Sequence, residues 1–199
     1  MATTSETLAE LIASRICHDL ISPVGAIGNG IELLELAGQA ESLEFSLLSE
    51  STAMATGKIR LFRVAFGHAS PGQVMTHREI RQIADSLSSE GRLRLNVEAV
   101  GDMLRQEAKL LFLLVMCVES AFPRGGDVTV HRSSDGWELV ASGPKPALDD
   151  ALWAALKEGG ADFSVQPSTI QFHLAATGAK ALQRKIVMTP GPDRLVLRF

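Results

Sequence analysis

Hydrophobic positions recur with a helical period in the first third of the chain. Residues 6–36 are rich in Leu, Ile and Ala and lack the alternation of a strand, and residues 41–66 continue in the same way. Gly38 separates the two segments. Acidic side chains come early and basic ones late in the second segment, the order that the helix dipole favours. The pattern therefore predicts two long helices joined by a turn.

The remaining two thirds of the chain mix helical and strand periods. Thr76 and Glu79 form a capping-box pattern that opens a helix. Alternating apolar residues over 93–97 predict a strand, and the strongly apolar segment 103–122 predicts a helix. Further strands are predicted at 128–130, 137–141, 185–188 and 195–199, and further helices at 147–158 and 168–183. The fold class is therefore α+β, a helical hairpin followed by a domain with a mostly antiparallel sheet.

Gly67–Gly72, with Pro71 inside it, interrupts the pattern and predicts a linker between two domains, 1–67 and 73–199. A length of 199 residues is enough for two small domains that bury cores of their own. The longest apolar run, Leu110–Val118, is far shorter than the roughly 20 residues of a membrane span. Two cysteines in apolar segments and no visible signal peptide favour a cytoplasmic protein with reduced thiols.

Charge and composition exclude some functions. The net charge is −4 and aromatic residues make up 5% of the chain, which argues against a nucleic-acid binder. The histidines other than His18 show no metal-ligand spacing, so no metal site is expected.

His18 stands out within the first predicted helix. At about 100° per residue, one apolar stripe lies at roughly 160–240° from it. The members of that stripe are Ala9, Ala13, Ile16, Leu20, Val24, Ile27, Ile31 and Leu34. Ser14, Ser22, Gly25 and Asn29, all small or polar, share the side of His18. The arrangement of residues around the helix therefore predicts an exposed histidine that another protein can approach. A surface histidine with no function, in contact only with solvent, would give the same pattern.

The local sequence His18-Asp19-Leu20-Ile21-Ser22-Pro23 narrows the choice. A proline inside a helix costs about 3 kcal/mol, so it needs a compensating reason. The segment resembles the phospho-acceptor box of histidine kinases, a His followed by an acid and, five residues on, by a Pro. The fuller run 16–27, with Asn29-Gly30, is similar to alphaproteobacterial histidine phosphotransferases of the ChpT type, and this resemblance covers the whole chain.

The resemblance implies that the second domain is a degenerate histidine-kinase ATPase-like α/β sandwich. The kinase Asn that holds magnesium falls at Cys117, its partner at Leu113, and the Asp that binds adenine at Ala141. Neither Cys117 nor Leu113 offers the hard oxygen ligand that magnesium requires. No Asn follows Asn96, and no glycine-rich lid is visible at 170–176. ATP binding is therefore not expected; an unrelated α+β domain is the alternative.

The resemblance also implies a function. His18 is expected to accept a phosphoryl group from the aspartate of a receiver domain of a hybrid histidine kinase and to pass it to response-regulator aspartates. The protein is then a phosphotransferase with no cofactor of its own, because the receiver supplies the magnesium. Two other functions stay open: a sensorless histidine kinase that uses ATP, and a scaffold that only binds receivers.

Several residues are expected to support His18. Asp19 either activates or only orients the ring. Lys58, beside His18 in an antiparallel hairpin, could reach the phosphate, although a snorkelling lysine is the favoured interpretation. Receiver docking is assigned to Ser14, Arg15, Ser22, Gly25, Asn29 and Lys58. Arg60 and Arg63 are expected to point into solvent, away from the apolar stripe that Leu47, Met54, Leu61 and Ala65 form with Lys58.

Two helices cannot enclose a core by themselves, whereas two hairpins can form a four-helix bundle across a two-fold axis. The sequence therefore predicts a homodimer that leaves His18 on its outer faces.

Overall fold

The structure is a computed structural model that describes residues 5–38, 43–90, 92–98, 101–133, 136–158 and 166–199. A few side chains within the helices are also outside this description, among them those of Ser14, Arg15 and Asp19. The chain divides into two compact units, Met1–His68 and Ala69–Phe199.

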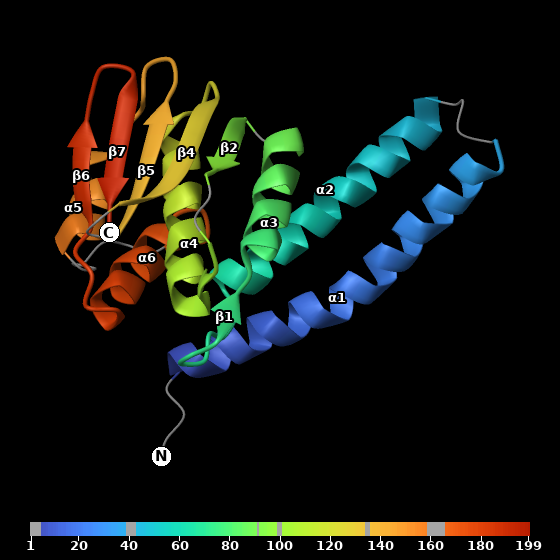
Figure 1. Ribbon diagram of the computed structural model, residues 1–199, viewed down its shortest axis with the longest axis horizontal. Coiled ribbons are helices and arrows are strands. Elements are labelled where there is room, and N and C mark those ends of the chain that lie inside the picture. The colour runs from blue at the N-terminus through green and yellow to red at the C-terminus, as the bar shows by residue number, and fades with distance from the viewer. Residues whose placement is uncertain (1–4, 39–42, 91, 99–100, 134–135, 159–165) are drawn as a thin grey trace. The chain divides into compact units, whose positions relative to one another are not determined.

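The N-terminal unit is an α-hairpin of α1 (Ser5–Leu36) and α2 (Leu43–Ala65), which pack against each other (Figure 1). Pro23 lies inside α1, and the helix continues through it. Gly38 follows the end of α1 with a φ of 75°, and its N–H donates to the carbonyl of Glu35 at 3.0 Å. A left-handed residue at this position satisfies a terminal carbonyl and stops the helix. The two predicted helices are confirmed, while residues 39–42 of the predicted turn lie outside the described residues.

The C-terminal unit contains a five-stranded sheet in the order β2-β4-β5-β7-β6. Its strands are β2 (Leu93–Val97), β4 (Gly126–Ser133), β5 (Gly136–Ser142), β6 (Val187–Pro190) and β7 (Arg194–Arg198). Among the strands that the structure describes, the β2–β4 pair alone is parallel, so the predicted mostly antiparallel sheet is confirmed. The helices are α3 (His77–Glu90), α4 (Arg105–Ala121), α5 (Asp150–Glu158) and α6 (Ile170–Ala181). The α+β fold class is thereby confirmed.

The start of α3 is built as its sequence predicts. The backbone N–H of Thr76 donates to Oε2 of Glu79 at 2.8 Å, and the N–H of Glu79 donates to Oγ1 of Thr76 at 3.3 Å. Oδ1 of Asp102 accepts from the N–H of His77 at 2.9 Å. These contacts satisfy backbone donors that a helix leaves free at its first turn.

The predicted helix over 103–122 begins too early. Met103–Leu104 is instead a short strand, β3, which pairs antiparallel with β1 (Val74–Met75). Two-residue strands contain no alternation to detect, and β3 borders directly on the apolar sequence of α4. The tertiary pairing, rather than local periodicity, therefore defines this boundary.

One face of the sheet carries the core. Inward residues of four strands are buried: Leu93, Leu95, Val97, Val128, Val130, Trp137, Leu139, Ala141, Leu195 and Leu197. On α4, eleven of seventeen residues are buried, which explains why its sequence is apolar on nearly every side. α6 packs against both α4 and α5, and Trp153 meets Phe172 edge to face with ring centroids 5.3 Å apart. The result is a two-layer sandwich with one apolar interior.

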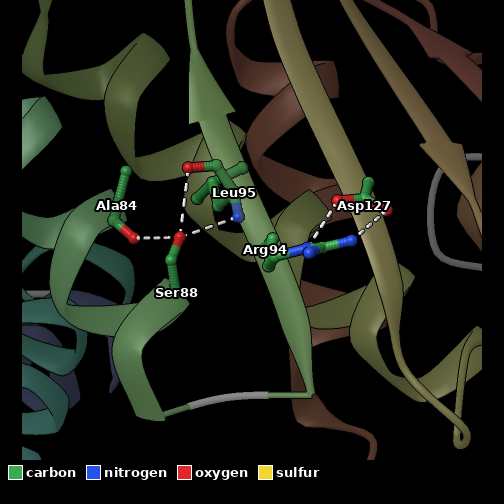
Figure 2. A network of polar contacts seen from close by, with 5 residues as sticks. All are labelled: Ala84, Ser88, Arg94, Leu95 and Asp127. Atoms are coloured by element: carbon green, nitrogen blue, oxygen red, sulfur yellow. Dashed lines mark hydrogen bonds and ion pairs between the residues drawn. The ribbon is translucent and has the colours of Figure 1, made fainter.

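α3 protects the β2 edge of the sheet (Figure 2). Oγ of Ser88 accepts from the N–H of Leu95 at 2.8 Å and lies 2.8 Å from the carbonyl oxygen of Ala84. The serine hydroxyl thus accepts from a backbone N–H of the edge strand that could otherwise pair with a strand of another molecule. On β2, Arg94 donates from Nε and Nη2 to the two carboxylate oxygens of Asp127 on β4, at 2.7 and 3.0 Å.

Three glycines, Gly125, Gly126 and Gly143, allow the turn between α4 and β4 to approach the end of β5 closely. A side chain on Gly126 would collide with the carbonyl oxygen of Ser142. A Cβ on Gly143 would lie 2.6 Å from the carbonyl oxygen of Gly125 and 2.8 Å from Cδ1 of Phe122. Packing therefore requires glycine at 143.

We expect Gly143→Ala to lower the free energy of unfolding by about 1–3 kcal/mol, because the new methyl group has no room. Gly178→Ala in α6 is the control, since no atom lies within 4 Å of its Cβ position and alanine should stabilise the helix by about 0.5–1 kcal/mol. Urea unfolding measures both. Equal stabilities of the two variants would contradict this account of Gly143.

None of the described helices combines the length and the apolar character that crossing a membrane requires.

Candidate functional site

His18 lies in the middle of α1 with its side chain exposed. Ser22 and Asn29 on the same side of the helix are also exposed, and no atom lies within 4 Å of the Cβ position of Gly25. This surface, defined by His18, Ser22, Gly25 and Asn29, is called the His18 surface below. It offers a low, open approach to the imidazole. The side chains of Ser14, Arg15 and Asp19, also predicted here, lie outside the described residues.

Pro23 affects the backbone beside His18. A proline has no N–H, so the carbonyl of residue 19, one position after the histidine, cannot receive the usual bond from residue 23. The helix thus carries a missing bond within one turn of the imidazole.

Contacts between the two helices show which side of α1 faces α2. Nδ1 of His68, three residues after the end of α2, lies 3.4 Å from Oε2 of Glu10, and Cγ2 of Thr52 in α2 lies 3.6 Å from the Cβ position of Gly28. Cys17 is buried, which raises the pKa of its thiol, while the positive charge of Arg63 acts in the opposite direction. Glu10, Cys17 and Gly28 share one line on α1, about 80–100° around the helix from His18.

The predicted apolar stripe of α1 divides between two environments. Ile31 is buried, and Val24 and Ala13 are half-buried, on the side toward α2. Ile16, Leu20, Ile27 and Leu34, at about 160–200° from His18, remain 43–53% exposed. The apolar surface is therefore wider than contact with one helix requires, and a part of it lies opposite His18 without cover in the described chain.

The structure changes the interpretation of the basic residues on α2. Thr52 marks the line of α2 that meets α1, and Arg63 lies only about 20° from this line. Lys58 lies about 120° from it, so the structure does not bring Lys58 beside His18. Leu61, the centre of the predicted stripe, lies on the opposite side of α2 from Thr52.

Arg63 is exposed and lies away from the apolar stripe of α2, as expected, but the side that it occupies is the one toward α1, which the sequence did not indicate. The physical reason is that small residues, Gly28 and Thr52, let the helices approach, whereas the helical wheel of α2 drew attention to its most apolar side. Small residues at matching heights of the two helices are the signal that could have found this line.

In the C-terminal unit, the residues at the kinase ATP-site positions belong to the core. Cys117, Leu113 and Ala141 are at most 1% exposed. Burial raises the pKa of the Cys117 thiol well above its usual value. Gly143, two residues after Ala141, has the packing role described above. Among the described residues no group of three or more His, Cys, Asp or Glu side chains could hold a metal ion.

Comparison with known families agrees with this architecture. The family described as "Histidine phosphotransferase C-terminal domain" matches residues 77–194, more than half of the chain. The chain belongs to this histidine phosphotransferase family. Protein phosphotransferase ChpT of Brucella abortus (strain 2308) is 36% identical to it over 126 residues. That alignment covers 62% of this chain and 60% of the Brucella protein, so the chain matches less than two thirds of its relative's length.

A solved structure has the same fold as this chain. The 1.7 Å structure of a bacterial phosphotransferase aligns with a TM-score of 0.68 and 24% identity, covering 99% of this chain and 97% of the other. The likeness extends over both units and establishes a common fold.

We expect Cys117→Asn to lower the free energy of unfolding by about 1–3 kcal/mol, because an amide without partners would enter the apolar core. The substitution restores the residue type that the kinase resemblance assigns to magnesium binding, yet it should not create nucleotide binding. Urea unfolding and calorimetric titration with a non-hydrolysable ATP analogue test both points, with Cys117→Ala as the control. An Asn variant that is as stable as the wild type and binds the analogue would contradict this interpretation of the core.

Proposed function

We propose that this protein transfers phosphoryl groups between receiver domains through His18. The observation that carries the proposal is an exposed histidine on the open His18 surface of a helical hairpin, in a member of a histidine phosphotransferase family. The donor is the receiver-domain aspartyl phosphate of a hybrid histidine kinase, and the acceptors are aspartates of response regulators. Such a relay would operate in the cytoplasm.

The chemistry needs little from this chain besides the imidazole. The lone pair of a ring nitrogen of His18 attacks phosphorus, and a nitrogen–phosphorus bond forms. The bond from the aspartyl oxygen to phosphorus breaks, and its electron pair stays on the carboxylate. The ring releases a proton from its other nitrogen to solvent, or keeps it until the group moves on. Because the transition state of phosphoryl transfer is loose, positioning and charge neutralisation account for most of the rate.

Magnesium belongs to the receiver in this proposal, and the protein itself has no cofactor. The side chains beside His18 are small, which suits a receiver that supplies the magnesium, because the receiver must bring its metal pocket close to the imidazole ring. Ser22, Gly25 and Asn29 are the described part of the docking surface, and Ser14, Arg15 and Asp19 extend it along the sequence. Lys58 is not retained as a docking residue beside His18, since it lies on another side of α2.

Autophosphorylation with ATP is the second candidate, and the C-terminal unit argues against it. Its positions for a metal-holding Asn and an adenine-binding Asp are occupied by buried Cys117 and Ala141. A scaffold that binds receivers without transfer is the third candidate. Exposure of His18 does not favour it, because a scaffold needs no imidazole.

We also propose that the protein is a homodimer. Ile16, Leu20, Ile27 and Leu34 form a half-exposed apolar stripe opposite His18. A second hairpin packed on that stripe completes a four-helix bundle and leaves both His18 surfaces accessible.

His18→Gln should abolish uptake of label from a phosphorylated receiver, because no ring nitrogen remains to attack phosphorus. His131→Gln, which removes an imidazole from β4, is the control and should be labelled like the wild type. The measurement is transfer of ³²P from receiver to this protein on a gel. Labelling of the His18 variant, or no labelling of the wild type by any receiver, would refute the proposal.

Radiolabelled ATP without a kinase separates the second candidate from the first. Wild-type protein should acquire no label under this condition. Label that appears and depends on His18 would identify a kinase instead.

Ile27→Glu should convert the dimer to a monomer, because a charge would enter the apolar interface of the bundle. Ser22→Glu, on the His18 surface, introduces the same side chain outside that interface and should remain dimeric. Light scattering at micromolar concentration distinguishes the masses. A monomeric wild type would exclude the dimer, and an Ile27→Glu dimer would exclude this interface.

A further inference from the structure

Two contacts determine which part of α2 lies level with His18. Glu10 meets His68 near one end of the hairpin, and Gly28 meets Thr52 farther along. Because α1 and α2 run antiparallel with equal rise, His18, ten residues before Gly28, lies level with the position about ten residues after Thr52, near residues 61 and 62 of α2. Arg60 and Arg63 stand on either side of this level.

The handedness of the helices then gives the side on which these arginines lie. His18 is about 80–100° from the contact line of α1, in the clockwise sense when the hairpin is viewed from the N-terminus of α1. Residues of the antiparallel helix α2 advance anticlockwise in this view, which places Arg60 about 80° and Arg63 about 20° from the contact line toward the same surface. Both arginines are exposed.

The opposite surface of the hairpin agrees with this assignment. Leu20 and Ile27 of α1 and Phe62 of α2 all fall there by the same geometry, and all three are exposed apolar residues. The hairpin therefore has an apolar surface on one side and a surface with His18 and two arginines on the other. The positive charge of Arg63 acts on the thiol of Cys17, the residue before His18, which agrees with this placement.

We propose that Arg60 and Arg63 are positioning residues that hold the phosphoryl group carried by His18. Packed helices have axes 8–10 Å apart, so long side chains on a shared surface can meet a group that extends from the neighbouring helix. Guanidinium donors match phosphate oxygens in pairs and keep their charge at all relevant pH values. This inference rests on the proposed transfer through His18 and adds the part of α2 that takes part in it.

The test compares Arg60→Gln, Arg63→Gln and the double variant with the wild type, in the full chain. Lys58→Gln is the matched control, because it removes one positive charge from the side of α2 away from α1. Phosphoramidate, a small phosphodonor, labels the histidine without a receiver. ³¹P NMR then follows the phosphoryl group through a pH titration, and a receiver assay measures the rate of transfer.

Loss of a nearby cation should raise the apparent pKa of the phosphoryl group, because the dianion loses a partner. Transfer from the receiver should slow about threefold for each single variant and about tenfold for the double variant, the size expected for exposed ion pairs. Arg63→Lys should restore a part of the effect on the titration, and Lys58→Gln should change neither measurement. Circular dichroism and thermal unfolding check that each variant is folded.

The outcomes separate this inference from the proposed function. If neither phosphoramidate nor a phosphorylated receiver labels the wild type at His18, the transfer function fails. If the wild type is labelled and the folded arginine variants titrate and transfer like Lys58→Gln, the transfer function stands and the role of the arginines is refuted.

Discussion

The packing of α1 on α2, marked by the contact of Gly28 with Thr52, defines the surfaces of the N-terminal hairpin. With no side chain at residue 28, the methyl carbon of Thr52 comes within 3.6 Å of where a Cβ would stand. This contact identifies the register and the rotation of the helices, because Gly28 and Thr52 lie on the lines along which α1 and α2 face each other. All surfaces of the hairpin follow from it: His18 on one side, the exposed apolar stripe of α1 opposite, and the arginines of α2 beside the histidine.

The C-terminal unit depends on a different constraint, the burial of α4 on nearly every side. A helix covered in this way contributes packing and leaves no space for a ligand at Cys117 or Leu113. Glycines at the end of the helix let β4 and β5 come together without side chains between them. The second unit has the stable apolar core of a folded domain, and the proposed phosphoryl transfer belongs to the hairpin.

Most helices and strands could be predicted from local patterns, because the hydrophobic period repeats over many residues in each of them. The capping box at Thr76 and Glu79 is a case in which two residues were enough, since the reciprocal bonds are local. β1 and β3 could not be predicted, because each has two residues and exists only through pairing across 28 positions of sequence. Ser88 likewise protects the edge of β2 through a contact that no period reveals.

Part of the candidate site could likewise be predicted from local sequence, and part depends on tertiary contacts. His18, its polar neighbours and the proline five residues on follow from the order of amino acids, because residues on one helix face are set by the 3.6-residue period alone. The choice between Lys58 and Arg63 did not follow from it. The two residues are five positions apart, both basic and both exposed. Only the side on which α2 meets α1 distinguishes them, and that side depends on a close contact between small residues of two different helices, which hydrophobicity does not encode.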